Sequence, residues 1–190
     1  MTTDMTMTKA QRLSPQDWMQ AGCRALARQG PPALKAEPLA RQLGLTKGSF
    51  YWHFKDVPAF HSALLADWLD RYEAEIRTPG ATSASPALRL RALAERLAQD
   101  GDGPEEARAQ EPAIRAWAES NAAAARVIAR ADALKREHVT RSLDDIGVSN
   151  PEIAQLLLAA AIGMRQLPGG DADLRARTMG SLVDLVLALR

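Results

Sequence analysis

The segment LARQLGLTKGSFYWHFK, residues 39–55, places a glycine turn between two short helical patterns. The first pattern is apolar on one side and is expected to end at Gly44, because glycine adopts the left-handed conformation that closes many helices. Thr46 is placed to cap the second helix, which is expected to run to about His53 or Phe54. Two helices joined by such a short turn predict a helix-turn-helix.

The second helix of this segment has one face suited to a core and others suited to a partner. Phe50 and Phe54 stand four residues apart, so they share one face and can anchor the helix. The remaining positions carry basic, hydroxyl or aromatic groups that can reach solvent or a phosphate: Lys47, Ser49, Tyr51, Trp52 and His53. This distribution indicates a helix that contacts DNA.

The stretch TKGSFYWHFKD, residues 46–56, resembles the recognition-helix signature of the TetR family of bacterial transcription regulators (TetR/AcrR type). In that family the pattern is a Ser or Thr cap, Lys-Gly, a small residue, an apolar-Tyr pair, a variable residue, His-Phe and a Lys that opens the next helix. Every element is matched, with Phe50 standing where Leu is commoner. The close match covers roughly the first 60 residues, and beyond them only length, helical content and element order agree.

The resemblance implies which residues contact DNA. Phosphate contacts position a protein on the duplex, whereas contacts with base edges specify the sequence. The residues expected mainly on phosphates are Thr46, Tyr51, His53 and Lys55. Those expected nearer the base edges are Lys47, Ser49 and Trp52, and Gly48 lets the helix backbone approach the groove closely.

Other roles stay open for three of these residues. Tyr51 can instead be a half-buried packing residue, and Trp52 can belong to the core or to a protein interface. Lys55 can simply solvate the start of the next helix.

Charge is distributed unevenly along the chain, although the net charge is only +1. Residues 1–60 carry eight Lys and Arg against four Asp and Glu, whereas residues 61–190 carry sixteen against nineteen. The basic part is therefore the part that contains the helix-turn-helix, as expected of a DNA-binding module.

The rest of the chain also predicts helices. An apolar stripe from Val57 to Ile76 predicts one long helix, and further helices are expected at about 86–99, 104–120, 121–146, 151–167 and 171–189. No stretch shows the alternation of a strand. We therefore expect an all-α fold of about nine helices, with an N-terminal three-helix helix-turn-helix domain joined by the long helix to a C-terminal bundle. The expected domains are 1–56, for DNA binding, and 57–190, for regulation, ligand binding and dimerisation.

The last two predicted helices are apolar nearly all round, whereas a surface helix needs only one apolar stripe. The surplus face predicts a two-fold four-helix interface with a second copy, like that of the resembled family, and a dimer would read a palindromic operator with its two recognition helices. A wholly internal pair of core helices is the alternative. The residues expected at the seam are Ile153, Leu157, Ala161, Leu182, Leu185, Val186 and Leu189.

The resemblance also implies a cavity for a small-molecule effector inside the bundle, whose occupation moves the long helix and weakens DNA binding. Aromatic residues are only 5% of the chain, which favours a modest apolar effector. Arg115 and His138 can pair with an acidic group on it, although a solvated or salt-bridged side chain is the ordinary state of Arg115. The candidate lining residues, each of which can equally be core, are Trp68, Tyr72, Leu93, Leu97, Trp117, Leu134, His138 and Met164.

Other functional classes receive less support from the sequence. There is no phosphate-binding glycine loop, CxxC pair or HExxH motif, so neither an enzyme, a cofactor nor a metal site is expected. The single cysteine, Cys23, excludes an intramolecular disulfide, and no apolar stretch is long enough for a bilayer, so a cytoplasmic protein is expected. The expected partners are operator DNA, a second copy and an unknown effector, with repression more usual than activation in the resembled family. A regulator controlled by a protein partner instead of a small molecule is the alternative.

Overall fold

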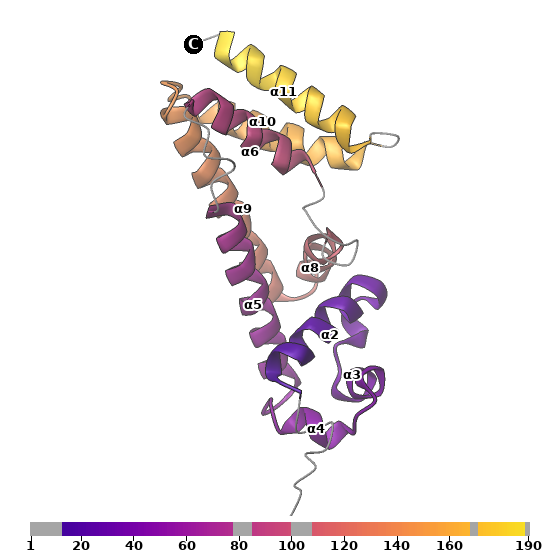
Figure 1. The fold of residues 1–190 in the computed structure, drawn as a ribbon. Coiled ribbons are helices and arrows are strands. Elements are labelled where there is room, and N and C mark those ends of the chain that lie inside the picture. The colour runs from indigo at the N-terminus through magenta and orange to yellow at the C-terminus, as the bar shows by residue number, and fades with distance from the viewer. Residues whose placement is uncertain (1–12, 78–84, 100–107, 168–170, 189–190) are drawn as a thin grey trace, which may run out of the picture. The chain divides into compact units, whose positions relative to one another are not determined.

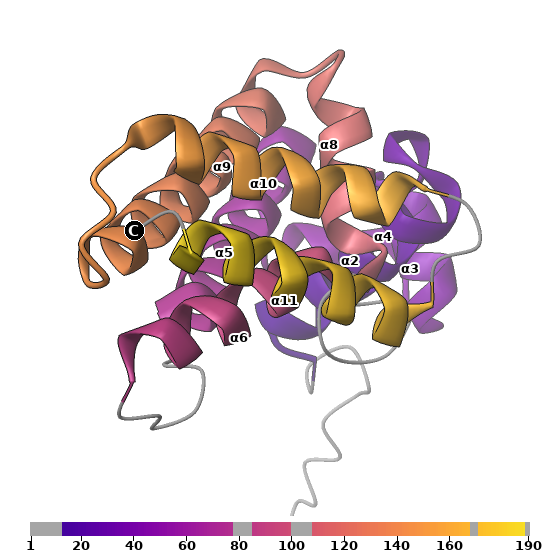
Figure 2. The same cartoon turned by 90° about the horizontal axis from the view of Figure 1, so that it is seen from above.

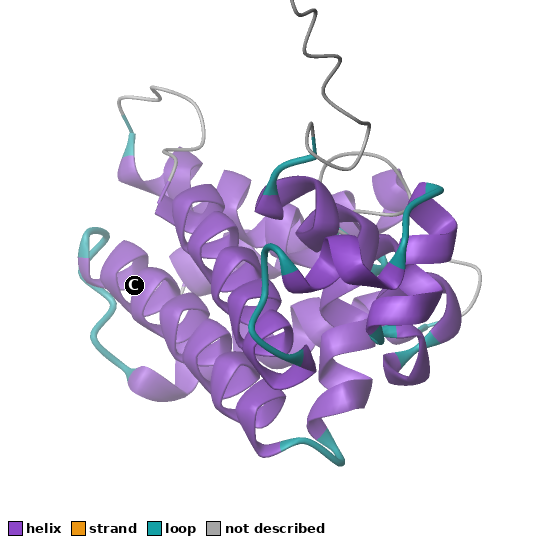
Figure 3. Ribbon diagram, turned by 90° about the horizontal axis from the view of Figure 1, so that it is seen from below, coloured by secondary structure: helices purple, strands orange, loops and turns teal. Residues whose placement is uncertain are grey.

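The computed structural model describes residues 13–77, 85–99, 108–167 and 171–188. Within these ranges the chain forms nine α-helices and one 3-10 turn, and no strand (Figure 3). The predicted all-α fold is confirmed. The elements are α2 (Pro15–Gln29), η1 (Pro31–Ala33), α3 (Ala36–Leu43), α4 (Lys47–Tyr51), α5 (Val57–Arg77), α6 (Pro86–Ala98), α8 (Gln110–Ala118), α9 (Ala122–Asp144), α10 (Pro151–Gln166) and α11 (Ala172–Ala188).

Most helix boundaries lie within about two residues of the predicted ones, because Pro, Gly and capping residues mark them. The helix predicted from residue 104 is described only from Gln110, and residues 100–107 lie outside the described ranges. None of the described helices is both long enough and apolar enough to cross a membrane.

The contacts divide the chain into two compact units. Unit 1 comprises Met1–Arg71 and Glu105–Ile128, and unit 2 comprises Tyr72–Pro104 and Ala129–Arg190. Helices α5 and α9 each contribute residues to both units. This division follows packing, whereas the expected boundary between residues 56 and 57 separates functions, and that boundary stays a prediction.

Helix α2 is the central helix of unit 1 and packs against η1, α3 and α8 (Figure 1). Ser14 and Asp17 cap its start reciprocally: the Asp17 N–H donates to the Ser14 hydroxyl and the Ser14 N–H to the Asp17 carboxylate, at 3.3 and 2.7 Å. Further along, α2 meets α5 so closely that a Cβ atom on Gly22 would lie 2.6 Å from Phe60 and Leu64. Only glycine allows this approach.

The turn between α3 and α4 has the predicted geometry. Gly44 has a φ of 68°, and the Leu45 N–H donates to the Ala40 carbonyl at 2.8 Å, which closes α3. Helix α4 ends at Tyr51, earlier than predicted. The reason is that the N–H groups of His53 and Phe54 share the Phe50 carbonyl, at 3.0 and 3.1 Å, which ends the regular helix in a tighter turn.

Aromatic rings form the core that holds α4 in place. Phe50 is fully buried, and its ring centroid lies 5.5 Å from that of Trp18, 5.2 Å from Phe54 and 5.2 Å from Phe60. The Trp18–Phe50 and Phe50–Phe60 pairs meet edge to face, which is a favourable arrangement for aromatic quadrupoles. The predicted anchoring role of Phe50 and Phe54 is confirmed.

Unit 2 is held by aliphatic side chains. Helix α6 packs against α10 and α11, and these two helices lie side by side in Figure 2. Leu90, Leu157 and Val183 are among the residues buried where α6, α10 and α11 meet. Arg91 on α6 forms an ion pair with Asp184 on α11, and Arg89 reaches Asp145, just after α9, at 3.3 Å.

Candidate nucleic-acid interface

The short helix α4 and the residues that flank it carry exposed side chains beside the buried rings of Phe50 and Phe54. Trp52 is 88% exposed and Tyr51 46% exposed, while Thr46, Lys47, Gly48 and Lys55 are also exposed. Because Trp52 lies in solvent, the alternative that it belongs to the core of the protomer is excluded. An indole left almost wholly in water is a surface that a partner can cover.

Two hydroxyl groups of the predicted set contact each other. Thr46 stands at the cap position in an extended conformation, but its side chain makes no capping bond to the backbone of α4. Instead its Oγ1 lies 3.0 Å from the Ser49 Oγ. This contact joins the exposed Thr46 to the buried Ser49.

Ser49 is the member of the predicted set that does not reach the surface. It is only 6% exposed and, with Phe50, is one of the two buried residues of α4. A side chain buried this far cannot reach a base edge without a rearrangement of the module, so the expected place of Ser49 near the bases is revised. Its hydroxyl contacts the Thr46 hydroxyl instead.

His53 and Lys55 lie where α4 gives way to α5. His53 is half-buried, with its ring centroid 6.4 Å from that of Trp18, and Lys55 is exposed. The Asp56 carboxylate accepts a hydrogen bond from the Ala59 N–H at 2.7 Å and so caps α5 directly after Lys55. The two predicted phosphate contacts are therefore fixed on the aromatic core and on the start of α5, respectively.

The predicted effector residues do not form one cluster within either unit. Trp68 and Trp117 belong to unit 1, and Trp117 packs edge to face on His61, with ring centroids 5.0 Å apart. The other six, which belong to unit 2, are partly or fully buried: Tyr72, Leu93, Leu97, Leu134, His138 and Met164. Of these, Leu93 lies in the apolar core of unit 2, with Leu97 and Met164 packed against it.

The two residues considered for an acidic group on the effector differ in their surroundings. Arg115 forms an ion pair with Glu111 at 2.9 Å, which is the ordinary state expected for it. His138 is half-buried on α9, where burial and the guanidinium groups of Arg96 and Arg141 lower its pKa.

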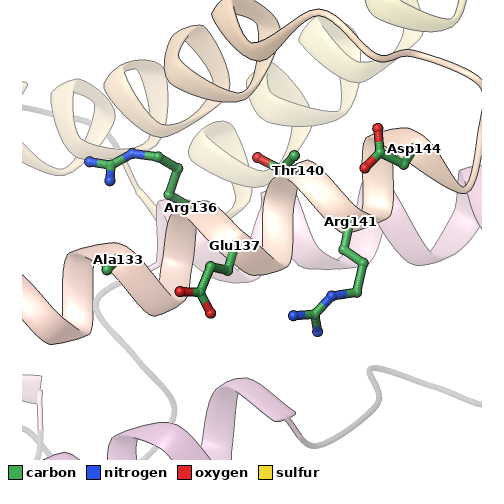
Figure 4. Close-up of a pocket in the computed structure, with 6 residues that line it drawn as sticks. All are labelled: Ala133, Arg136, Glu137, Thr140, Arg141 and Asp144. Carbon is green, nitrogen blue, oxygen red and sulfur yellow. The ribbon is translucent and has the colours of Figure 1, made fainter.

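A shallow groove of about 360 Å³ lies along α9. Its lining residues all belong to this helix and are mostly charged, as Figure 4 shows: Ala133, Arg136, Glu137, Thr140, Arg141 and Asp144. None of the predicted effector residues lines this groove, and its polar character differs from the apolar cavity that was expected.

The predicted dimer seam requires a correction. Leu157, Ala161 and Val186 are buried within the core of unit 2, so they cannot form the surface of an interface. Leu185, by contrast, is 64% exposed, and Ile153 and Leu182 are partly buried; Leu189 lies outside the described residues. Other large apolar side chains of α10 and α11 are exposed as well, namely Leu156, which is 60% exposed, Ile162 and Leu174.

Lys135 is a residue that the sequence reasoning did not select. It is 6% exposed. Among the described residues, only Lys135 and Ser49 combine a polar or charged side chain with a buried position. Its signal was present in the sequence, since Lys135 stands four residues from Ala131 and from Val139, on the buried stripe of α9. Its ammonium group lies 5.3 Å from the centroid of the Tyr72 ring.

Comparison with known proteins agrees with this arrangement. Residues 19–56 match the family model of the bacterial regulatory proteins of the tetR family. The match covers most of α2 and all of α3 and α4, which are the elements that position the exposed side chains on α4. No curated protein sequence matches the chain.

Several solved structures share the fold at low sequence identity. One is a transcriptional regulator from Rhodococcus sp. Rha1 (TM-score 0.74, 19% identity, 93% of this chain and 97% of that one). Another is a TetR transcription regulator from Haloarcula marismortui (TM-score 0.71, 18% identity, 90% and 96%). A third, described as a transcriptional regulator from Saccharomonospora viridis, was solved in complex with choline (TM-score 0.70, 16% identity, 90% and 95%).

These likenesses at under 25% identity establish the fold, and the family model identifies the N-terminal module. Residues 19–56 are thus a DNA-binding domain of the TetR family of bacterial regulatory proteins, in a chain that has the fold of TetR-family transcriptional regulators.

Proposed function

We propose that this protein is a homodimeric repressor that binds a palindromic DNA operator in the cytoplasm and is released from it by a small-molecule effector. Its predicted DNA contacts are Thr46, Lys47, Gly48, Tyr51, Trp52, His53 and Lys55, with Ser49 positioning Thr46.

The observation that carries this proposal is the contrast between the two faces of α4. Phe50 is fully buried, whereas Trp52, two residues later, is 88% exposed between exposed Tyr51 and half-buried His53. A helix of five residues gains little stability by itself, so the buried phenylalanines must hold it. The helix is therefore held firmly, and its exposed side chains are hydroxyl, basic and aromatic. Such groups suit contact with phosphates and base edges.

A second copy of the chain is supported by the outward face of α10 and α11. Leu156 and Leu185 are both more than half exposed on these two packed helices, with Ile162 and Leu174 on the same pair. Exposed aliphatic side chains gathered on neighbouring helices are typical of an interface. A two-fold dimer would present two recognition helices to one palindrome.

An effector is supported by the family and by one structural neighbour, whose structure contains choline. Regulation of this kind needs only an effector that binds more tightly to the conformation with low DNA affinity. A protein partner in place of the effector remains the second way to control such a regulator.

Selection of bound sites from a randomised DNA pool tests the proposal. We expect the wild-type protein to enrich a palindrome and the variant Trp52→Ala with Lys55→Ala to enrich none, because both side chains are exposed and their loss leaves the core unchanged. Arg136→Ala, an exposed residue on α9, is the matched control and should select the same site as the wild type.

Salt dependence separates the two contact types. Lys55→Ala should weaken binding to all sequences and reduce the magnitude of the negative slope of log affinity against log salt by about 1, since one phosphate contact is lost. Lys47→Ala should change the sequence preference. Failure of the folded wild-type protein to enrich any sequence would contradict the proposal.

A further inference from the structure

Trp52 differs from the other three tryptophans of the chain. Trp18, Trp68 and Trp117 are at most 5% exposed, whereas Trp52 is 88% exposed. A tryptophan contributes most to a fold when its large apolar ring is buried, so an indole left in water indicates that the ring serves a partner instead. The side chain has only two torsions, so ordering it against a partner costs little conformational entropy.

The backbone that carries Trp52 is held by its neighbours. Phe50 and Phe54, two residues before and two residues after it, are at most 7% exposed, and the N–H groups of His53 and Phe54 donate to the Phe50 carbonyl. Trp52 itself continues α4 with helical torsion angles, φ −69° and ψ −27°. Buried neighbours on both sides therefore fix the backbone of Trp52, while its indole stays exposed.

The helical wheel of α4 shows which residues share the outward side with Trp52. Ser49 and Phe50 are the buried residues of this helix. At about 100° per residue, the direction opposite to these two falls close to Gly48, with Lys47 on one side of it and Trp52 on the other. Gly48 is exposed and has no side chain, so a groove that receives α4 can reach both flanking residues.

The burial of Ser49 leaves two side chains, Lys47 and Trp52, for the base edges, and they differ in chemistry. The major groove presents hydrogen-bond donors and acceptors and a single apolar group, the C5 methyl of thymine. Lysine is a donor, suited to the guanine O6 and N7. An indole has one N–H donor, no acceptor and a large apolar ring, so the thymine methyl is the group that its ring suits.

We propose that Trp52 is a specificity-determining residue whose indole packs on the C5 methyl of a thymine in each half of the operator. The proposal rests on the proposed function as a DNA-binding regulator and names the chemical group that the exposed tryptophan recognises. Contact with a base edge is expected here because the second helix of a helix-turn-helix lies in the major groove.

Operators that differ by single methyl groups test the contact. Deoxyuridine pairs with adenine as thymidine does and lacks only the C5 methyl. In the selected palindrome, deoxyuridine replaces thymidine at one symmetric pair of positions at a time, and fluorescence anisotropy at fixed salt measures affinity. We expect one such pair to weaken wild-type binding about fifteen-fold, or about four-fold per half-site, which is the value of about one buried methyl group in each half.

Variants connect this loss with the indole. Trp52→Ala should bind the thymidine and deoxyuridine operators equally within about two-fold, because the ring that contacts the methyl is gone. Trp52→Phe keeps an apolar ring and removes the indole N–H, so it should still prefer thymidine. Lys47→Ala, at the other exposed flank of Gly48, is the matched control and should weaken binding while the preference for thymidine is kept. Circular dichroism checks that each variant is folded.

The outcomes separate this contact from the proposed function. If a palindrome is selected but no deoxyuridine pair weakens binding, or if the folded Trp52→Ala variant shows the same loss as the wild type, thymine recognition is overturned and operator binding stands. Loss of the preference in Trp52→Phe also overturns it, because the contact then belongs to the N–H. If a single half-site is selected and one deoxyuridine weakens binding only when Trp52 is present, the contact stands and the dimeric operator fails. If no sequence is selected, both fail.

Discussion

The helices of the two units pack through different kinds of side chain. In unit 1, one large ring, Phe50, meets Trp18, Tyr51, Phe54 and Phe60 at centroid distances between 5.2 and 5.5 Å. In unit 2, many aliphatic side chains of similar size fill the contacts of α6, α10 and α11. The geometry of α4 therefore depends on a few residues, whereas unit 2 distributes its packing over many.

This difference also separates what the two units expose. Unit 1 exposes polar and aromatic groups at defined positions on α4, while unit 2 exposes leucines on α10 and α11 that resemble its buried ones. A single substitution should consequently damage unit 1 most when it removes a ring from the core. In unit 2 it should matter most whether the substituted leucine points inward or outward.

Phe50→Ala is the change with the largest expected effect. Truncation of a fully buried ring leaves a cavity among four other rings, which should lower the free energy of unfolding by about 3–5 kcal/mol. Chemical denaturation followed by circular dichroism measures it. Leu88→Ala, at an exposed position of α6, is the control and should change the free energy by less than about 0.5 kcal/mol. If Phe50→Ala lowers the free energy of unfolding by less than about 1 kcal/mol, the aromatic core of unit 1 repacks around the missing ring, and its geometry does not depend on a few residues.

The packing of unit 1 could be predicted from the sequence because its residue types differ sharply between faces. Phe50 and Phe54 recur at helical spacing and are buried, Gly44 has the expected positive φ, and Trp52 lies outside the core. The exception was Ser49, whose small polar side chain is compatible with either face. Its hydroxyl lies 3.0 Å from that of Thr46, a contact that no sequence pattern indicates.

The outward leucines of unit 2 give the second largest expected effect. Leu156→Asp combined with Leu185→Asp should weaken the proposed dimer at least 100-fold, about 2.7 kcal/mol, because carboxylates would be buried in an apolar interface. Sedimentation measures the dissociation constant, and the monomer should keep its helical content. Leu88→Asp, also exposed but on α6, should leave the dimer unchanged. An unaltered dimer in the double variant would contradict the proposed face.

The seam itself could not be assigned from the sequence, for a physical reason. When a helix is apolar nearly all round, its periodicity no longer tells the core face from the partner face. Leu156 and Leu157 are neighbours of the same type, yet Leu156 is 60% exposed and Leu157 is buried in the apolar core of unit 2. Lys135 illustrates the opposite case, because its charge on an apolar stripe was visible in the sequence but was not interpreted.

Two glycines of the helix-turn-helix give the smallest and most selective test, because one serves the fold and the other is expected to serve DNA binding. Gly44→Ala should lower the free energy of unfolding by about 1 kcal/mol, since a φ of 68° is strained for alanine. Gly48→Ala should raise it by up to about 1 kcal/mol, because alanine favours the helix and its Cβ would meet nothing nearer than the Thr46 hydroxyl, at 3.7 Å.

The two substitutions should rank differently in operator affinity and in stability. We expect Gly48→Ala to weaken operator binding several-fold, because a methyl group on the exposed backbone of α4 holds the helix away from the groove. Gly44→Ala should bind almost normally at a temperature where it is still folded. Fluorescence anisotropy with the selected operator, beside thermal unfolding of the same samples, compares the two. If Gly48→Ala is as stable as expected and binds as tightly as the wild type, the backbone of α4 does not approach DNA closely, and contact is made through the long side chains of Lys47, Tyr51 and Trp52 alone.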